Sequence, residues 1–243
     1  MSLEFSLAKD LILIKKYIDE SLSPSQITTT HMYENKLPSD IKNSVIQVKN
    51  SNNIYSHLLK LTSLKNKIKP VTEMNEVYCS KHRGVGCKAG SDAVFETKHI
   101  DGPFGMIPKM TLFRCIVTIC NETETETIVK ENTYNMKEGE FVAIDYNRDL
   151  HYIKIKEGFT PEEKAKRYVL KLHYISYPSW CPEIIAKMYG LLNINYNIIA
   201  RKAFLYTLKP TTFPQKTLNW AINTTTKIWA VFFYKSGPDV SGA

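Results

Sequence analysis

The chain has 243 residues, enough for one substantial core with helical extensions, and we predict a single domain. Apolar residues make up 43% of the sequence and charged residues 23%, a composition that excludes global disorder and is typical of a packed globular protein. The net charge of +8 favours an anionic partner such as nucleic acid, phospholipid or an acidic cosubstrate. The lysines are scattered and do not alternate with aromatic residues, so a dedicated nucleic-acid face is the less favoured interpretation.

The cysteines and the N-terminus bear on the compartment. Five cysteines are an odd number without a compact framework, which indicates a reducing environment. Residues 1–14 lack the continuous apolar centre of a signal peptide, and no apolar run approaches the ~20 residues that a transmembrane helix needs. We therefore expect an intracellular, cytoplasmic protein with no transmembrane segment.

The first part of the chain has helical periodicity. Apolar residues recur at helical spacing between Leu7 and Leu22, and Ser23-Pro24-Ser25 ends that segment. Residues 41–64 fit one or two more helices, with Ser51 to Asn53 as a break or N-cap. The segment between them mixes turn-like and strand-like residues and is not assigned.

Residues 70–93 are rich in glycine and polar residues and short of helical periodicity. The sequence Gly84-Val-Gly86 indicates backbone turns, because no strand-to-helix pattern follows it to form a phosphate site. Cys79, His82 and Cys87 raise a zinc site as an alternative, but a closed site needs four ligands and no Cys-x-x-Cys pair is present. Thiols in a loop or strand are the favoured interpretation.

Strand patterns dominate from Val94 to Ile175, where we expect at least five strands. The acidic and threonine residues of 122–127 alternate and suggest an exposed edge or a hairpin tip. The clearest strands are expected at residues 112–119, 141–144, 151–155 and 167–175.

Beyond Pro178 the helical spacing returns. Apolar residues of 184–192 fit one helical face, and those of 198–206 fit another. An aromatic segment from Trp220 to Phe233 is too short to span a bilayer, and we expect it to pack on the core. Pairing with a second subunit or contact with a membrane surface are the alternatives.

Three residues suggest a metal site. His99 and Asp101 are two positions apart, so on an extended strand both side chains project from the same face. His151 begins a later predicted strand and can supply a second imidazole. Two imidazoles and one carboxylate on one side of an ion leave the opposite positions open, which is the ligand pattern of iron(II) oxygenases. Each histidine alone is more often a structural hydrogen-bonding residue, so the hypothesis depends on the combination.

The segment from Phe95 to Tyr174, about a third of the chain, resembles the iron(II)- and 2-oxoglutarate-dependent dioxygenases, especially the prolyl-hydroxylase-like branch. The matching pieces occur in the family order and are His99–Pro103, Phe113–Ile119, Gly139–His151 and Arg167–Tyr174.

The resemblance implies an α+β fold with a double-stranded β-helix, or jelly-roll, core. We expect a helical N-terminal region at 1–69, the core at 70–177 and a helical extension at 178–243. Such a core has about eight strands, so the remaining strands are expected between Ile68 and Val94 or in the polar hairpin.

The resemblance also implies iron(II) on His99, Asp101 and His151, with 2-oxoglutarate and O2 as cosubstrates and ascorbate as an accessory reductant. Arg167 is expected to hold the far carboxylate of 2-oxoglutarate, because a guanidinium binds a carboxylate through two parallel hydrogen bonds. Its spacing from His151 is longer than is usual in the family, so the alternatives for this role are Lys164, Lys166 and Arg114. Candidates to line the pocket are Tyr78, Tyr134, Tyr146 and Tyr152.

The expected reaction is hydroxylation of a C–H bond, with a protein side chain such as proline as the nearest family analogy. Fold and cofactor do not determine the substrate, so nucleic acid or a small molecule such as a lipid or free amino acid is an alternative. The competing hypotheses of another class are a non-catalytic binding module on the same scaffold and a membrane-associated interaction protein that uses the aromatic segment.

Overall fold

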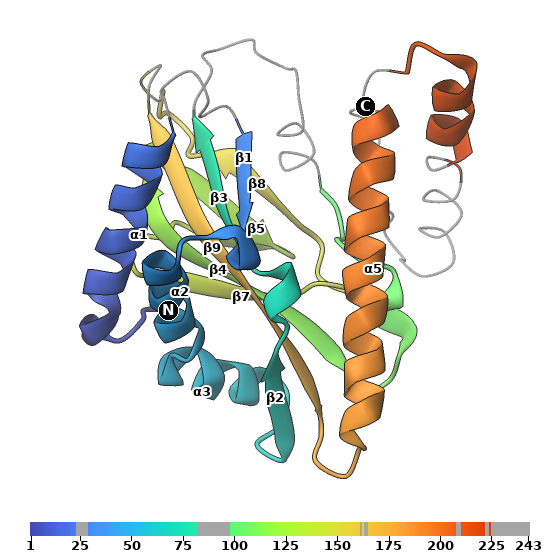
Figure 1. Ribbon diagram of the computed structural model, residues 1–243, viewed down its shortest axis with the longest axis horizontal. Coiled ribbons are helices and arrows are strands. Elements are labelled where there is room, and N and C mark those ends of the chain that lie inside the picture. The colour runs from blue at the N-terminus through green and yellow to red at the C-terminus, as the bar shows by residue number, and fades with distance from the viewer. Residues whose placement is uncertain are drawn as a thin grey trace.

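The computed structural model of the chain describes residues 1–22, 29–81, 98–160, 162, 165–207, 210–221 and 224. Figure 1 shows N-terminal helices, antiparallel β-sheets and one long C-terminal helix. The fold is therefore α+β, as the sequence predicts.

The N-terminal helices form where the apolar spacing predicts them. A 3-10 turn, η1 (Phe5–Leu7), leads into α1 (Ala8–Ser21), and α2 (Ser39–Lys49) and α3 (Asn52–Leu61) follow. The Ser51 side chain caps α3 by accepting a hydrogen bond from the backbone N–H of Ile54 at 3.3 Å. The predicted break between the two helices is confirmed at this serine.

The larger sheet has six strands in the order β1-β3-β9-β4-β7, with β2 pairing with β9 outside this path. Its longest strand, β9, pairs with β2, β3 and β4, all antiparallel. Both β1 and most of β2 lie within residues 1–69, so that region also contributes strands to the sheet. The strands are β1 (Thr29–Tyr33), β2 (Asn66–Pro70), β3 (Glu76–Lys81), β4 (Thr111–Asn121), β7 (Phe141–Asp145) and β9 (Lys166–Pro178).

The smaller sheet has the order β6-β5-β8, with β5 (Thr125–Val129), β6 (Asn132–Tyr134) and β8 (His151–Ile155). Because β5 lies between two partners, the prediction of an exposed edge at residues 122–127 is wrong for the strand itself. The polar residues before it form a turn, in which Asn121 bonds to the backbone of Thr125. An isolated bridge between His99 and His151 extends the pairing on the other side of β8.

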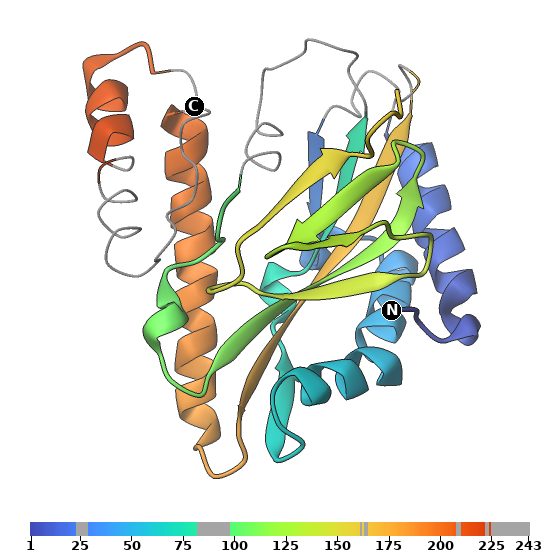
Figure 2. The same ribbon diagram turned by 180° about the vertical axis from the view of Figure 1, so that it is seen from behind.

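The two faces of the larger sheet pack against different partners, because side chains alternate along each strand. The even-numbered residues of β9 pack in a core with α1, α2 and α3. On the opposite face, Val169 of β9 and Ile116 of β4 pack with Val129 of the smaller sheet. Figure 2 shows the smaller sheet on the side of the larger sheet away from the N-terminal helices.

The chain passes repeatedly between the two sheets. After β3 in the larger sheet it reaches the bridge at His99 beside the smaller sheet, and then returns to the larger sheet as β4. It continues through β5 and β6 in the smaller sheet, β7 in the larger, β8 in the smaller and β9 in the larger. The six strands from β4 to β9 agree with the expected minimum of five, and β2 and β3 supply strands upstream.

The C-terminal region contains α5 (Glu183–Thr207), one continuous helix where the sequence shows two apolar faces. Ala186, Tyr189 and Gly190 on one side of α5 are buried, and Ile175 of β9 lies against Gly190. Residues 213–221 form another helical segment. Most of the predicted aromatic segment lies outside the described residues.

Candidate functional site

The three predicted metal ligands come together beside the smaller sheet. One ligand atom from each of His99, Asp101 and His151 lies within 4.8 Å of the other two. The backbones of the two histidines hold each other through a pair of N–H to carbonyl hydrogen bonds, each 3.0 Å long. The His99 and Asp101 side chains lie together for the reason that the sequence predicts. An extended His-x-Asp segment projects both side chains from one face, here toward the start of β8.

The donor atoms of this group suit a metal ion. The carboxylate of Asp101 lies 3.9 Å from His99 Nε2 through Oδ1 and 3.3 Å from His151 Nε2 through Oδ2. The two imidazole rings are 4.4 Å apart between centroids. His151 is buried, and the other two residues are partly buried. Two neutral imidazole nitrogens and one carboxylate are a set that non-haem iron(II) binds.

A backbone contact sets the orientation of the second imidazole. His151 Nδ1 lies 3.0 Å from the carbonyl oxygen of Asp149, and only a protonated Nδ1 can donate to that oxygen. The Nε2 lone pair is then directed toward Asp101. Metal-ligating histidines are usually fixed by such a contact of the second ring nitrogen.

Arg114 is the charged partner of the carboxylate. Its Nη1 donates to Asp101 Oδ2 at 2.6 Å, and its Nε donates to His173 Nε2 at 3.0 Å. Burial would raise the pKa of Asp101, but the guanidinium of Arg114 holds that pKa well below its usual value. The group is therefore an ionised carboxylate, which is the form that binds a cation.

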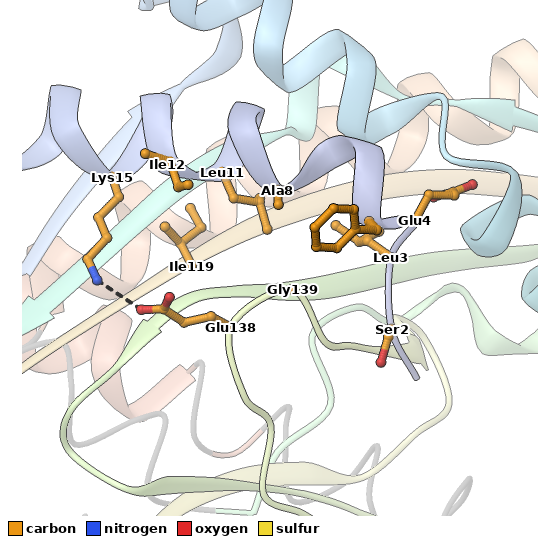
Figure 3. Close-up of a pocket in the computed structure, with 11 residues that line it drawn as sticks. Ser2, Leu3, Glu4, Ala8, Leu11, Ile12, Lys15, Ile119, Glu138 and Gly139 are labelled. Atoms are coloured by element: carbon orange, nitrogen blue, oxygen red, sulfur yellow. Dashed lines mark hydrogen bonds and ion pairs between the residues drawn. The ribbon is translucent and has the colours of Figure 1, made fainter.

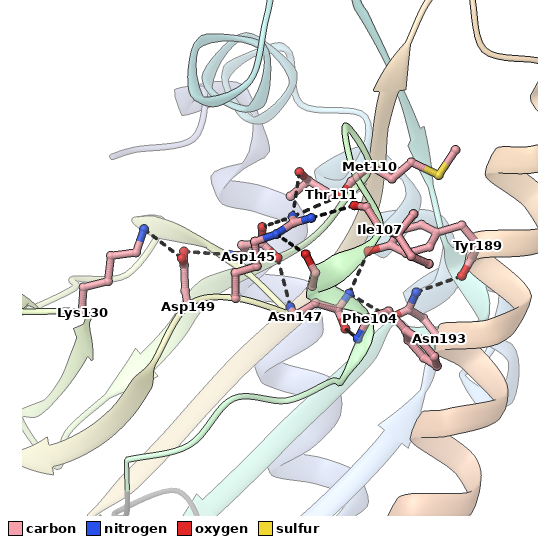
Figure 4. Close-up of polar contacts among 12 residues, drawn as sticks. Phe104, Ile107, Met110, Thr111, Lys130, Asp145, Asn147, Asp149, Tyr189 and Asn193 are labelled. Atoms are coloured by element: carbon pink, nitrogen blue, oxygen red, sulfur yellow. Dashed lines mark hydrogen bonds and ion pairs between the residues drawn. The ribbon is translucent and has the colours of Figure 1, made fainter. Parts of the chain in front are cut away.

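The loops that carry the ligands are fastened to each other by Asn147, which is fully buried (Figure 4). Its Oδ1 accepts a hydrogen bond from the backbone N–H of Phe104 at 3.2 Å, just beyond Asp101. Its Nδ2 donates to Tyr189 and Asn193 of α5, at 2.9 and 3.0 Å. A Cβ at Gly102 would collide with Asn147, so glycine permits this close approach.

Arg148 makes a second connection between the loops. Its guanidinium donates to the carbonyls of Gly105 and Ile107, both at 2.8 Å, and to that of Met110 at 3.2 Å. It also pairs with Asp145 at 2.8 Å. The segment after Asp101 is therefore held against the segment before His151 by side chains as well as by the backbone bridge.

Further buried charges lie on the same face of the larger sheet. Lys171 pairs with Glu76 Oε1 at 2.9 Å, and Glu76 Oε2 lies 3.0 Å from His31 Nδ1. The ammonium of Lys171 also lies 4.3 Å from the ring centroid of Tyr78. Burial would raise the pKa of Glu76, but Lys171 and His31 hold it well below its usual value.

The predicted cosubstrate residue Arg167 is buried on this same face, at the start of β9. It lies six residues along β9 from His173, the partner of Arg114, which corresponds to about 20 Å along the strand. Lys171 is only two residues from His173, or about 7 Å. Along β9, Lys171 is therefore closer than Arg167 to His173, which bonds to the Arg114 that holds Asp101.

The other predicted site residues have different positions. Lys166 bonds to Asp19 of α1 at 2.7 Å and is directed to the helical side, and Lys164 lies outside the described residues. Among the tyrosines, Tyr78 and Tyr146 are buried near Lys171 and Arg114, whereas Tyr134 is exposed. Of the residues proposed for the alternative zinc site, His82 and Cys87 lie outside the described residues. Cys79 is buried among core residues.

Sequence reasoning did not identify Glu76, Lys171, His173 or Asn147 as parts of this site. The alternation of β9 could have indicated Lys171 and His173, since both fall on the face opposite its buried leucines. Nothing local marks Asn147 or Glu76, whose partners are 42 to 95 positions away.

A surface hollow of about 320 Å³ lies elsewhere, between the start of α1 and the sheet (Figure 3). Its walls are mainly apolar side chains such as Leu11 and Ile119, with the Lys15–Glu138 ion pair at its edge. It does not include the three candidate ligands.

The described helices include none with the length and apolarity needed to cross a bilayer.

Comparison with models of known protein families finds no match, and neither does comparison with curated proteins. Among solved structures, one similar chain is an HTH_3 family transcriptional regulator from Vibrio cholerae, at 12% sequence identity. The alignment covers 71% of this chain and 95% of that chain, with a TM-score of 0.24. A likeness this weak carries no conclusion about fold or function.

Proposed function

We propose that the protein is an iron(II)- and 2-oxoglutarate-dependent dioxygenase that hydroxylates a C–H bond, with a protein side chain such as proline as the substrate class. The observation that carries the proposal is the convergence of His99, Asp101 and His151 within 4.8 Å. Proline as the substrate rests on the sequence resemblance alone.

We also propose that the two sheets are the halves of a double-stranded β-helix. The alternation of the chain between the sheets from β3 to β9 supports this topology. In this proposal β3-β9-β4-β7 would form one four-stranded half, and β6-β5-β8 with the bridge at His99 would form the other.

The described residues fit the ion. His99, Asp101 and His151 would hold it, and the carbonyl of Asp149 keeps the Nε2 lone pair of His151 free for coordination. Arg114 occupies Asp101 Oδ2, so Oδ1 is the oxygen that faces His99. Iron(II), when bound, supplies the activation of O2 and the oxidative decarboxylation of 2-oxoglutarate.

The protein must also bind the far carboxylate of 2-oxoglutarate in this account. The sequence prediction for this role is Arg167, and strand spacing favours Lys171, which is about 13 Å closer to His173 along β9. His173 Nδ1 adds a buried ring nitrogen that lacks a hydrogen-bond partner among the described residues. Arg167→Ala tests the choice, because an unchanged KM for 2-oxoglutarate would exclude Arg167 and leave Lys171, Lys164 or Arg114 for the contact.

The experiment that tests the function is anaerobic addition of iron(II) and 2-oxoglutarate, followed by exposure to O2. We expect a weak visible absorption band under anaerobic conditions, and succinate formation after O2 is admitted. Both should be lost in Asp101→Ala and His151→Ala. The control is His57→Ala, since His57 lies on α3 against Phe141, in another part of the fold.

Absence of the band in the wild-type protein at saturating ligand would contradict the proposal. Retention of succinate formation in Asp101→Ala would contradict the ligand assignment. A band without succinate formation would favour a non-catalytic binding module.

A further inference from the structure

The outward side of α5 is apolar along almost its whole length. An amphipathic helix usually turns its apolar side inward and its polar side to water. Here the inward side includes Asn193, which bonds to Asn147, whereas most outward residues are aliphatic. Among the α5 side chains that the structure describes, the exposed apolar ones are Ile184, Ile185, Met188, Leu191, Leu192, Ile198, Ile199 and Tyr206.

This surface, which we call the outer α5 face, is long and continuous. From Ile184 to Tyr206 it extends about 33 Å at the rise of an α-helix. Trp180 precedes the helix with 72% of its surface exposed, and Lys109 lies 5.6 Å from its ring centroid. Exposed apolar surface on this scale indicates an interaction site.

The sequence of the C-terminal region is basic. Residues 177–243 contain seven lysines and arginines and two acidic residues, so this region carries a net charge of +5 out of the total of +8. One of the acidic residues, Glu183, pairs with Lys69 and with Lys187. On α5 itself, Lys187 and Lys202 are exposed.

We propose that the outer α5 face binds the surface of an anionic phospholipid membrane. Aliphatic side chains with a tryptophan at one end would enter the interfacial layer, and the lysines would contact lipid phosphates and carboxylates. The helix would lie in the plane of the interface.

A second copy of the chain fits this surface less well. If two α5 helices paired antiparallel about the middle of the apolar stretch, near Asn195, Lys187 of each would face residue 203 of the other. Lys187 would then lie beside Lys202 at both ends of the pair. Like charges opposed in this way destabilise a helix pair, whereas an anionic surface attracts both.

The test is sedimentation of the full chain with vesicles of phosphatidylcholine alone and with vesicles containing about one third phosphatidylserine. We expect binding to the anionic vesicles, weaker binding to the neutral ones, and a fall in binding as salt is raised. The decisive variant is Ile199→Glu, and the matched control is Ile12→Glu on α1, because these isoleucines are 66% and 67% exposed.

Ile199→Glu should reduce the ratio of bound to free protein roughly tenfold or more, since it removes an apolar side chain that would enter the membrane and adds a charge that the anionic surface repels. Ile12→Glu should leave the ratio unchanged. No binding by the wild-type protein, or equal loss in both variants, would overturn the proposal. A dimer that Ile199→Glu dissociates, without vesicle binding, would assign the surface to a second copy. Binding is measured without iron, so the result is independent of the proposed reaction.

Discussion

The two faces of β9 differ in what they bury. The face toward α1, α2 and α3 carries Tyr168, Leu170, Leu172 and Tyr174, and it packs as a conventional apolar core. The opposite face carries three buried basic or titratable side chains, Arg167, Lys171 and His173. One strand therefore supplies both the stability of the fold and the charged lining beside the candidate metal site.

The pairing of its side chains explains how the charged face of β9 is tolerated. A buried charge is costly unless it is paired and hydrogen-bonded. Lys171 has Glu76 at 2.9 Å, and Arg114 has both Asp101 and His173 within 3.0 Å. We infer that the charged face serves the candidate metal site and that its buried groups are stable only because they are paired. Substitutions at Lys171, Asn147, His173 and Tyr168 should show this dependence with decreasing effect.

The largest effect is expected from Lys171→Met. The substitution removes the buried ammonium that pairs with Glu76, and breaking a buried pair from one side costs about 3–5 kcal/mol. Urea unfolding measures the loss. The double variant Glu76→Gln/Lys171→Met should recover part of the lost stability, because neither charge is then left in the interior. A double variant that is as unstable as the sum of the two single variants would contradict the pairing.

Asn147→Ala should loosen the two ligand loops. It removes the acceptor of Phe104 N–H and the donor to Tyr189, for an expected loss of about 1–3 kcal/mol in the free energy of unfolding. Affinity for manganese(II) should fall roughly tenfold, as it does when groups that orient metal ligands are removed. The control is Asn121→Ala, whose side chain bonds to Thr125 at the far end of β4. A loss of manganese(II) affinity in both variants would show general destabilisation.

Stability should decrease with falling pH because of His173. Burial and the neighbouring Arg114 hold its pKa well below the usual value of 6.5. Below about pH 6.5 the unfolded chain therefore binds a proton that the folded chain does not, and the folded state loses stability as pH falls. Between pH 7.5 and 5.5 this effect should lower the free energy of unfolding by about 1.4 kcal/mol. His173→Gln should remove this part of the pH dependence in urea unfolding, and an unchanged slope would contradict the assignment.

The smallest effect is expected on the helical face. Tyr168 donates from its hydroxyl to Asp19 at 2.9 Å, but Asp19 also binds Lys166 and is partly exposed. Tyr168→Phe should therefore cost at most about 0.5–1.5 kcal/mol in the free energy of unfolding. Manganese(II) affinity should not change, and a change would mean that the two faces of β9 are coupled.

Local patterns were sufficient for much of the fold and for the candidate ligands. The helices at α1, α2 and α3 follow their apolar spacing, and β9 follows its run of strand-forming residues. His99 and Asp101 lie together because a two-residue spacing on extended backbone places side chains on one face. The position of His151 opposite His99 follows from the start of a strand that the sequence also indicates.

Long-range pairings could not be predicted in this way. Glu76 and Lys171 are 95 positions apart, and Asn147 bonds to residues of α5 more than 40 positions later. Apolar periodicity identified α5 as a helix but did not determine which side faces the protein, since the inward contacts of Tyr189 and Asn193 are polar as well as apolar. Such choices depend on which surfaces meet, and a single sequence does not record that.

The most direct test of the central claim is titration of manganese(II) into the metal-free protein, followed by electron paramagnetic resonance of the free ion. We expect one binding site in the wild-type protein and in His57→Ala, and loss of that site in His99→Ala, Asp101→Ala and His151→Ala. Unchanged binding in all three ligand variants, or no binding in the wild-type protein, would contradict the metal centre.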